Sequence, residues 1–315
     1  ESPFLIYKKR SAQDAHCGVQ GRCRKRPPQA QECAFAHSLF YIRKVLVNIS
    51  PVQKAVCLKV TGIWQVWFEK GVCKMYEKEI EQLQAMIDES NRIVFFGGAG
   101  VSTESNIPDF RSATGIYHQK YKYSPEQVVS HSFFMKYPEA FYEFYKEKMM
   151  ILDAKPNAAH LKLAELEQAG KLQAVVTQNI DGLHQAAGSR KVYELHGSIH
   201  RNYCMKCGKF YDAEYVKNSE GIPRCSCGGM IKPDVVLYEE GLDQKTIQGA
   251  VEAISSADML IIGGTSLVVY PAAGFIDYFH GKHLVVINKS ETARTVRAEL
   301  VISAPIGEVL GAIHV

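Results

Sequence analysis

Short apolar runs alternate with helical patterns over residues 75–315. The segment YEKEIEQLQAMIDES places Leu83, Met86 and Ile87 at the spacing of one helical face, and the run IVFF follows it closely. Similar runs stand in KLQAVVTQNIDG, ADMLIIGGTSL and HLVVINKS, and each ends in glycine or polar residues. Continuous apolar strands between helices predict an α/β fold, a Rossmann-like doubly wound parallel sheet. Ligands of such sheets lie beyond the carboxyl ends of the strands, where these polar residues fall.

Residues 1–74 show neither a sustained helical period nor strand alternation. They hold 13 Lys and Arg against 4 Asp and Glu, a net charge of +9, whereas residues 75–315 hold 24 against 29, a net charge of −5. All eight methionines lie at or after Met75. We therefore expect residues 1–74 to be a disordered extension or a segment translated from upstream of a start at Met75. A basic arm that binds nucleic acid or an acidic partner is the alternative.

The composition is that of a globular protein, since 46% of the 315 residues are hydrophobic and 22% are charged. No uninterrupted apolar run reaches the roughly 20 residues of a membrane helix, and we identify no signal peptide. We expect a cytoplasmic protein with no membrane partner and no specific nucleic-acid partner. The sequence does not predict its oligomeric state.

Polar and glycine residues at several strand ends favour a dinucleotide site. Gly98 and Gly100 would let the backbone turn tightly and approach a pyrophosphate. Thr265, Ser266 and Asn288 offer hydroxyl and amide groups at two further strand ends. Each of these residues taken singly is more often a turn or cap residue, and a G-x-G pattern alone is weak evidence. Their occurrence at one edge of one sheet gives the prediction its weight.

Four cysteines predict a zinc site. Cys204 and Cys207 form one close pair, Cys225 and Cys227 form a second, and 17 residues separate the pairs. Two close thiolate pairs, each followed by glycine, suit a tetrahedral zinc ion. Disulfides are the alternative, which a reducing cytosol disfavours. Because four thiolates fill the coordination shell, we expect a structural zinc that folds a small module.

His196 is a candidate general base. It directly follows a predicted strand end in VYELHGSIH, and Gly197 comes next. A neutral imidazole there could take a proton from a ribose hydroxyl. A capping or core histidine is the ordinary alternative.

These segments together resemble the sirtuins, a family of NAD-dependent protein lysine deacylases. The resemblance rests on GAGVSTESNIPDFR, TQNIDGLH, YELHGS, the four cysteines, KPDVVLYEE, GGTSLVVYPAA and VVINKS, which occur in the family's order. It covers residues 76–315 and is nearest to bacterial members. The resemblance implies that NAD is consumed as a co-substrate and that acetyl-lysine proteins or peptides are the other substrate.

The resemblance also implies roles for individual residues. His196 and Asn179 would be catalytic, and Phe110 would shield the ribose after nicotinamide leaves. Ile180 and Asp181 would bind the nicotinamide carboxamide. The implied cofactor contacts are Gly98, Ala99, Gly100, Thr103, Asp109, Phe110, Arg111, Tyr117, Gln178, Ile180, Asp181, Gly264, Thr265, Ser266, Asn288 and Ile306. The substrate peptide would lie as an added strand along Val235, Val236, Leu237 and Tyr238.

The implied reaction yields nicotinamide, O-acetyl-ADP-ribose and free lysine. Mono-ADP-ribosyl transfer and removal of other acyl groups remain open, because they use the same cofactor site. Members that prefer acidic acyl groups carry a Tyr-x-x-Arg pair, and here Tyr145 and Lys148 occupy those positions on the predicted helix EAFYEFYKEKMM. A lysine cannot form the two-armed contact of an arginine, so we expect a preference for short neutral acyl groups.

We expect one catalytic domain over residues 75–315. Its Rossmann-like parts would be residues 75–112, 157–199 and 234–315. The inserted modules would be a helical segment, 113–156, and a zinc-binding segment, 200–233.

Overall fold

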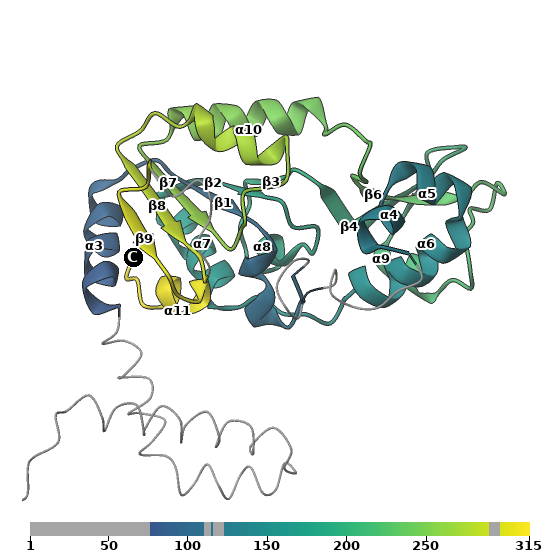
Figure 1. Ribbon diagram of the computed structural model, residues 1–315, viewed down its shortest axis with the longest axis horizontal. Coiled ribbons are helices and arrows are strands. Elements are labelled where there is room, and N and C mark those ends of the chain that lie inside the picture. The colour runs from purple at the N-terminus through teal and green to yellow at the C-terminus, as the bar shows by residue number, and fades with distance from the viewer. Residues whose placement is uncertain (1–75, 110–114, 116–122, 290–296) are drawn as a thin grey trace, which may run out of the picture. The chain divides into compact units, whose positions relative to one another are not determined.

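The computed structural model describes residues 76–109, 115, 123–289 and 297–315 (Figure 1). All of them belong to one compact unit, Cys73–Val315. Among the helices of these residues, none combines the length and apolar character needed to span a bilayer. Predicted contacts at Phe110, Arg111 and Tyr117 lie outside the described residues, as does the basic segment 1–74.

The larger layer is a six-stranded parallel sheet with strand order β3-β2-β1-β7-β8-β9. Its strands are β1 (Ile93–Gly97), β2 (Leu172–Thr177), β3 (Val192–Glu194), β7 (Met259–Gly263), β8 (His283–Ile287) and β9 (Leu300–Ile302). Strands β1, β2 and β3 follow one another toward one edge of the sheet. Strand β7 then pairs with the other side of β1, and β8 and β9 follow toward the opposite edge. The reversal between β1 and β7 is the place where doubly wound sheets bind ligands. The predicted fold class is confirmed.

Helices cover both faces of this sheet. Alternate side chains of β1 point to opposite faces, so Phe95 belongs to the apolar cluster with α3, α7 and α11, while Phe96 belongs to the cluster with α10 and η6. Both rings are fully buried. The covering elements are α3 (Glu77–Glu89), α7 (Ala158–Gln168), α11 (Ile306–Gly311), α10 (Gln244–Ser256) and η6 (Ala272–Tyr278).

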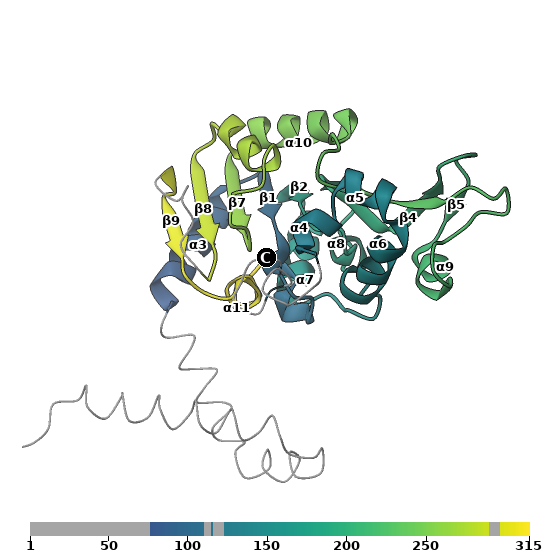
Figure 2. The ribbon, with the colours of Figure 1, turned by 45° about the vertical axis from the view of Figure 1, so that its right-hand side comes forward.

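A smaller module holds a three-stranded antiparallel sheet in the order β5-β4-β6. Its strands are β4 (Gly197–Cys204), β5 (Phe210–Tyr211) and β6 (Ile231–Val235), and its helices include α4 (Pro125–Val128), α5 (His131–Lys136), α6 (Pro138–Phe144), η5 (Tyr145–Met149) and α9 (Ala213–Asn218). Side chains of both predicted inserts share one apolar cluster, in which Phe141 and Tyr142 meet Val216 and Ile231. Figure 2 shows β4 running from beside the large sheet into this module.

The remaining short elements carry the loops at the carboxyl edge of the large sheet. They are η2 (Ala99–Val101), η3 (Thr103–Ser105) and α8 (Leu183–Ala186). The first two follow β1, and α8 follows the loop after β2. Their placement beside the β1–β7 reversal makes this edge the candidate site.

Candidate active site

The loops after β1 and β7 cross in direct backbone contact. Gly98 N–H donates to Gly263 O at 3.2 Å, and Gly100 N–H donates to Gly264 O at 2.7 Å. A Cβ atom at Gly100 would lie 2.8 Å from Gly264 Cα, and Gly264 itself has φ +58°. The glycines are therefore required by the crossing of the two loops, whether or not a phosphate approaches them. The sequence analysis predicted the approach of a phosphate but not the crossing of the loops.

Polar side chains from two strand ends meet at this crossing. Gln178, just after β2, donates from Nε2 to Thr265 Oγ1 at 3.0 Å, and Thr103 Oγ1 donates to Gly100 O at 2.9 Å. Ser266 is exposed, and Asn288 follows β8 at the same edge. The structure thus brings together most of the predicted cofactor residues that it describes.

Ile306 differs from the other predicted cofactor residues. It is buried in the main core, and a Cβ atom at Gly263 would lie 2.2 Å from its Cδ1. A contact of Ile306 with cofactor stays a prediction.

Ser102 is a site residue that the sequence analysis did not identify. Its hydroxyl donates to Asp181 Oδ2 at 2.6 Å and accepts from Asn179 Nδ2 at 3.0 Å. Ser102 is 1% exposed and Asn179 8%. The serine therefore fixes the orientation of both predicted residues relative to the β1 loop. A serine within a glycine loop is a signal that the sequence offers, but the partners of Ser102 come from a segment almost 80 residues away.

His196 is held by hydrogen bonds at its side chain and its backbone. Nδ1 lies 2.9 Å from Gln178 O, and His196 O accepts from Val236 N at 3.0 Å. Because a carbonyl can only accept, Nδ1 carries the proton and Nε2 keeps its lone pair. Burial lowers the pKa of His196, and the bond to Gln178 O offsets part of this shift. A neutral imidazole with Nε2 as its basic atom is the form that proton abstraction requires.

The predicted peptide strand has its amide groups already engaged. Val236 N donates to His196 O, Leu237 N to Glu240 Oε2, and Tyr238 N to Val129 O. A substrate peptide that pairs with this segment would therefore have to donate its N–H groups to the carbonyl groups of the segment, or displace these bonds. Substrate contact at Val235–Tyr238 stays a prediction.

The four predicted zinc ligands cluster at one end of the small module. Cys204 Sγ lies 3.5 Å from Cys227 Sγ, Cys207 Sγ lies 3.6 Å from Cys225 Sγ, and all four sulfurs lie within 4.8 Å of one another. Four thiolates at about 2.3 Å from a tetrahedral zinc would be about 3.8 Å apart. The cysteines are not joined by disulfides. The arrangement can hold a tetrahedral metal ion.

Three glycines shape the cysteine cluster. Gly208 and Gly228, each directly after a cysteine, have φ +71° and +79°. A Cβ atom at Gly229 would lie 2.6 Å from Cys204 Sγ. Side chains at these positions would strain the turns or crowd the sulfurs.

Tyr145 and Lys148 lie in different surroundings, and their part in acyl binding stays a prediction. Tyr145 is fully buried against Phe141, with ring centroids 5.4 Å apart, and Lys148 Nζ lies 2.7 Å from Glu147 Oε1. Both stand in η5, a π-helical turn, whereas the sequence pattern predicted an ordinary helix here.

A buried histidine pair lies beneath the loop that follows β2. The rings of His160 and His184 have centroids 4.7 Å apart, and both residues are at most 1% exposed. Neither nitrogen of His184 has a hydrogen-bond partner among the described residues. Burial lowers the pKa of His160 to about 4 and that of His184 to about 3. The pair is therefore neutral near pH 7, and its protonation opposes folding.

Comparisons with known proteins agree with this architecture. A model of the Sir2 family matches residues 98–271. The NAD-dependent protein deacetylase of Clostridium acetobutylicum is 65% identical over 236 residues, which cover 74% of this chain and 96% of that protein. The protein of the same name from Clostridium perfringens is 61% identical over 239 residues, which cover 75% and 98%.

Solved structures give the same result. A Sir2 protein with p53 peptide and NAD+ matches with a TM-score of 0.66 at 41% identity, covering 73% of this chain and 95% of that one. A Sir2 variant with deacetylated p53 peptide and 3'-O-acetyl ADP-ribose matches with a TM-score of 0.69, also at 41% identity and with the same coverage.

The histidine pair predicts a loss of stability in mild acid. Below pH 6.5 an unfolded histidine binds a proton that the folded pair does not, so stability falls with pH down to the folded pKa values of about 4 and about 3. Each histidine contributes about 1.4 kcal/mol per pH unit in this window. Denaturant unfolding of His184→Leu at pH 7, 6 and 5 should show a shallower pH dependence than the parent protein. His280→Leu, which changes an exposed histidine, is the control; equal slopes in all three proteins would contradict the account.

Proposed function

The chain belongs to the Sir2 family, and we propose that it is an NAD-dependent protein lysine deacetylase whose products are nicotinamide, O-acetyl-ADP-ribose and deacetylated lysine. The observation that carries the proposal is His196, held as a neutral imidazole with its Nδ1–H on Gln178 O. The relatives named as deacetylases match 74% and 75% of this chain over almost their own whole length, which supports the same reaction here. The chain's acetyl-lysine substrate would be a protein or peptide, as in the neighbouring structures with bound peptide.

The residues present suit a dinucleotide at the β1–β7 crossing. Gly98, Ala99, Gly100, Gly264 and Thr265 would surround its phosphates and ribose. When bound, NAD would supply the ribose hydroxyl that accepts the acetyl group and the glycosidic bond whose cleavage releases nicotinamide. Ser102 keeps Asn179 and Asp181 in fixed positions by its two hydrogen bonds.

His196 would act in proton transfer. Its Nε2 would accept a proton from a ribose hydroxyl, and the hydrogen bond from Nδ1 to Gln178 O stabilises the imidazolium that results. The bond from Val236 N to His196 O ties the base to the segment that we propose binds the peptide. This bond therefore holds His196 at a fixed distance from the proposed peptide segment.

We also propose that Cys204, Cys207, Cys225 and Cys227 bind a structural zinc ion. The sulfur spacings and the glycine turns support this assignment. Four thiolates leave no open coordination position for a substrate. The ion would stabilise the small module, including β4, which begins next to His196.

Replacing His196 tests its role as the base. His196→Ala should lower kcat for deacetylation by about 10²- to 10⁴-fold and leave the Kd for NAD within about threefold. In the parent enzyme the acidic limb of kcat should have its midpoint below pH 6.5, because burial lowers the pKa of His196. His280→Ala controls for loss of a histidine elsewhere. Normal turnover by His196→Ala would remove His196 from the mechanism.

Zinc content tests the metal proposal. The parent protein should contain about one zinc per chain, and Cys225→Ser should lose zinc and unfold at a lower temperature, because metal binding is coupled to folding. Elemental analysis and thermal unfolding measure both quantities. Ser226→Ala alters the adjacent residue without removing a ligand. A metal-free Cys225→Ser protein with unchanged stability would contradict a structural zinc.

The acyl preference follows from Tyr145 and Lys148. With Tyr145 buried and Lys148 paired to Glu147, a succinyl carboxylate would lack a two-armed partner. We expect kcat/KM for acetyl-lysine to exceed that for succinyl-lysine in the same peptide by at least about tenfold, since an unpaired carboxylate is costly to bury. A succinyl preference that disappears in Lys148→Ala would show that Lys148 binds the acyl carboxylate.

A further inference from the structure

Strand β4 carries a bulge close to the proposed active site. Ser198 pairs with Asp234 of β6, and Asn202 pairs with the adjacent Pro233, so Ile199, His200 and Arg201 are extra residues on β4. The bulge begins three residues after His196. Bulges next to active sites commonly direct side chains to new positions.

The first side of the bulge contacts the loop after β2. His200 Nε2 lies 2.9 Å from Asp181 O, so it carries a proton and donates, and Ile199 N donates to Ile180 O at 3.0 Å. A Cβ atom at Gly182 would lie 2.7 Å from His200 Cδ2. His200 therefore packs over the loop whose Ile180 and Asp181 we expect to contact nicotinamide.

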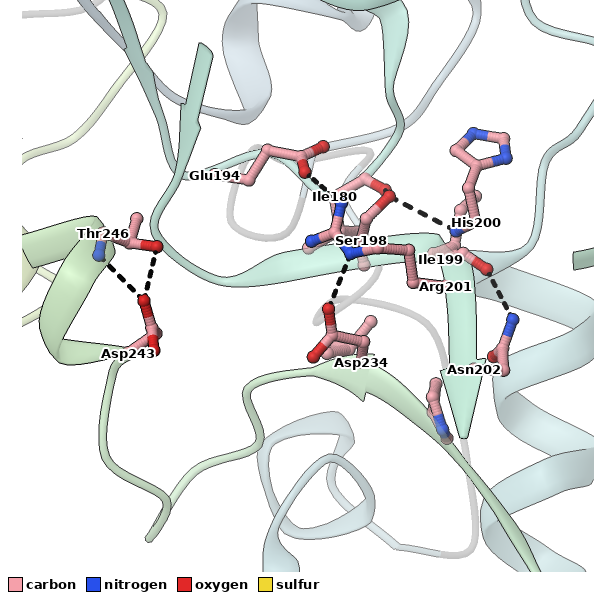
Figure 3. A network of polar contacts seen from close by, with 12 residues as sticks. Ile180, Glu194, Ser198, Ile199, His200, Arg201, Asn202, Asp234, Asp243 and Thr246 are labelled. Atoms are coloured by element: carbon pink, nitrogen blue, oxygen red, sulfur yellow. Dashed lines mark hydrogen bonds and ion pairs between the residues drawn. The ribbon is translucent and has the colours of Figure 1, made fainter. Parts of the chain in front are cut away.

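The second side of the bulge joins two other segments. Arg201 Nη1 lies 2.6 Å from Glu194 Oε2, and Arg201 Nε lies 2.7 Å from Asp234 Oδ2. Figure 3 shows Arg201 between these carboxylates, with the His200 ring directed elsewhere. Glu194 precedes His196 by two residues, and Asp234 immediately precedes the proposed peptide segment. Arg201 thus connects the backbone leading to the base with the backbone leading to the substrate strand.

We propose that the bulge Ile199–Arg201 is a two-sided positioning element, in which His200 sets the nicotinamide-contacting loop and Arg201 sets the peptide segment. The inference rests on the proposed deacetylase function. His200 is exposed and Arg201 is 39% exposed at its side chain. The exposed His200 contact contributes little to stability, so its effect is expected in cofactor binding and in catalysis. Arg201 also pairs with Glu194, whose side chain is only 8% exposed, so its kinetic effect is read together with a measurement of stability. Because His200 contacts Asp181 O whereas Arg201 contacts the carboxylates of Glu194 and Asp234, the two effects are separable.

Steady-state kinetics of two variants test the proposal. His200→Ala should raise the KM for NAD and the inhibition constant of nicotinamide about three- to tenfold, because one hydrogen bond is lost. It should leave the KM for the peptide within about twofold. Arg201→Met should raise the peptide KM by a similar factor and leave the nicotinamide constant unchanged. Exchange of labelled nicotinamide into NAD gives a second measure of the His200 effect.

Conservative variants separate positioning from loss of structure. His200→Gln keeps an N–H donor, so its inhibition constant for nicotinamide should return close to that of the parent protein. Arg201→Lys should bring the KM for the peptide only part of the way back to the parent value, because lysine lacks the fork of arginine. If Arg201→Met folds poorly with Glu194 unpaired, the double variant Arg201→Met/Glu194→Gln replaces it. Arg190→Met, which changes an exposed arginine on the large domain, is the matched control.

The outcomes distinguish this inference from the function on which it rests. A parent protein that does not deacetylate with NAD overturns the proposed function. An active parent protein whose two variants alter the NAD and peptide constants in parallel, or alter neither, overturns the two-sided role alone. A split in the predicted directions supports it.

Discussion

The hydrogen bond from His196 Nδ1–H to Gln178 O is the interaction on which the proposed chemistry depends. It decides that Nε2 is the basic nitrogen, and it can form only because β2 and β3 pair in register, Thr177 opposite Glu194. Gln178 is held in turn, since its N–H donates to Gly97 O at the end of β1. The register of the sheet therefore determines which nitrogen of His196 is basic.

The same sheet edge imposes close approach on the cofactor loops. The β1 and β7 loops cross at backbone hydrogen-bond distance, so a methyl group at Gly100 would clash with Gly264. This crossing fixes the position of Ser102, which in turn holds Asn179 and Asp181. On the other side of His196, the small module meets the large sheet through β4 and β6. The proposed active site therefore lies where the two sheets meet, joined by backbone bonds such as Val236 N to His196 O and Ile199 N to Ile180 O.

Much of this arrangement could be predicted from the sequence. The apolar runs predicted β1, β2, β7 and β8, and the paired cysteines predicted a cluster, because local patterns determine both. The partners of Ser102, the bulge at His200 and Arg201, and the internal bonds of Val236 could not be predicted, since they depend on which distant segments pair. The π-turn at Tyr145 was also missed, because it departs from the spacing that helical patterns assume. The roles of Phe110, Arg111 and Tyr117 stay predictions, outside the described residues.

The central claim is that this chain couples the cleavage of NAD to the removal of acetyl groups from lysine. The most direct measurement is mass spectrometry of a reaction containing the protein, NAD and one acetyl-lysine peptide, with all products quantified over time. The account predicts equal amounts of nicotinamide, O-acetyl-ADP-ribose and deacetylated peptide, and no deacetylation without NAD. Release of free acetate without NAD, or attachment of ADP-ribose to a peptide that keeps its acetyl group, would contradict it.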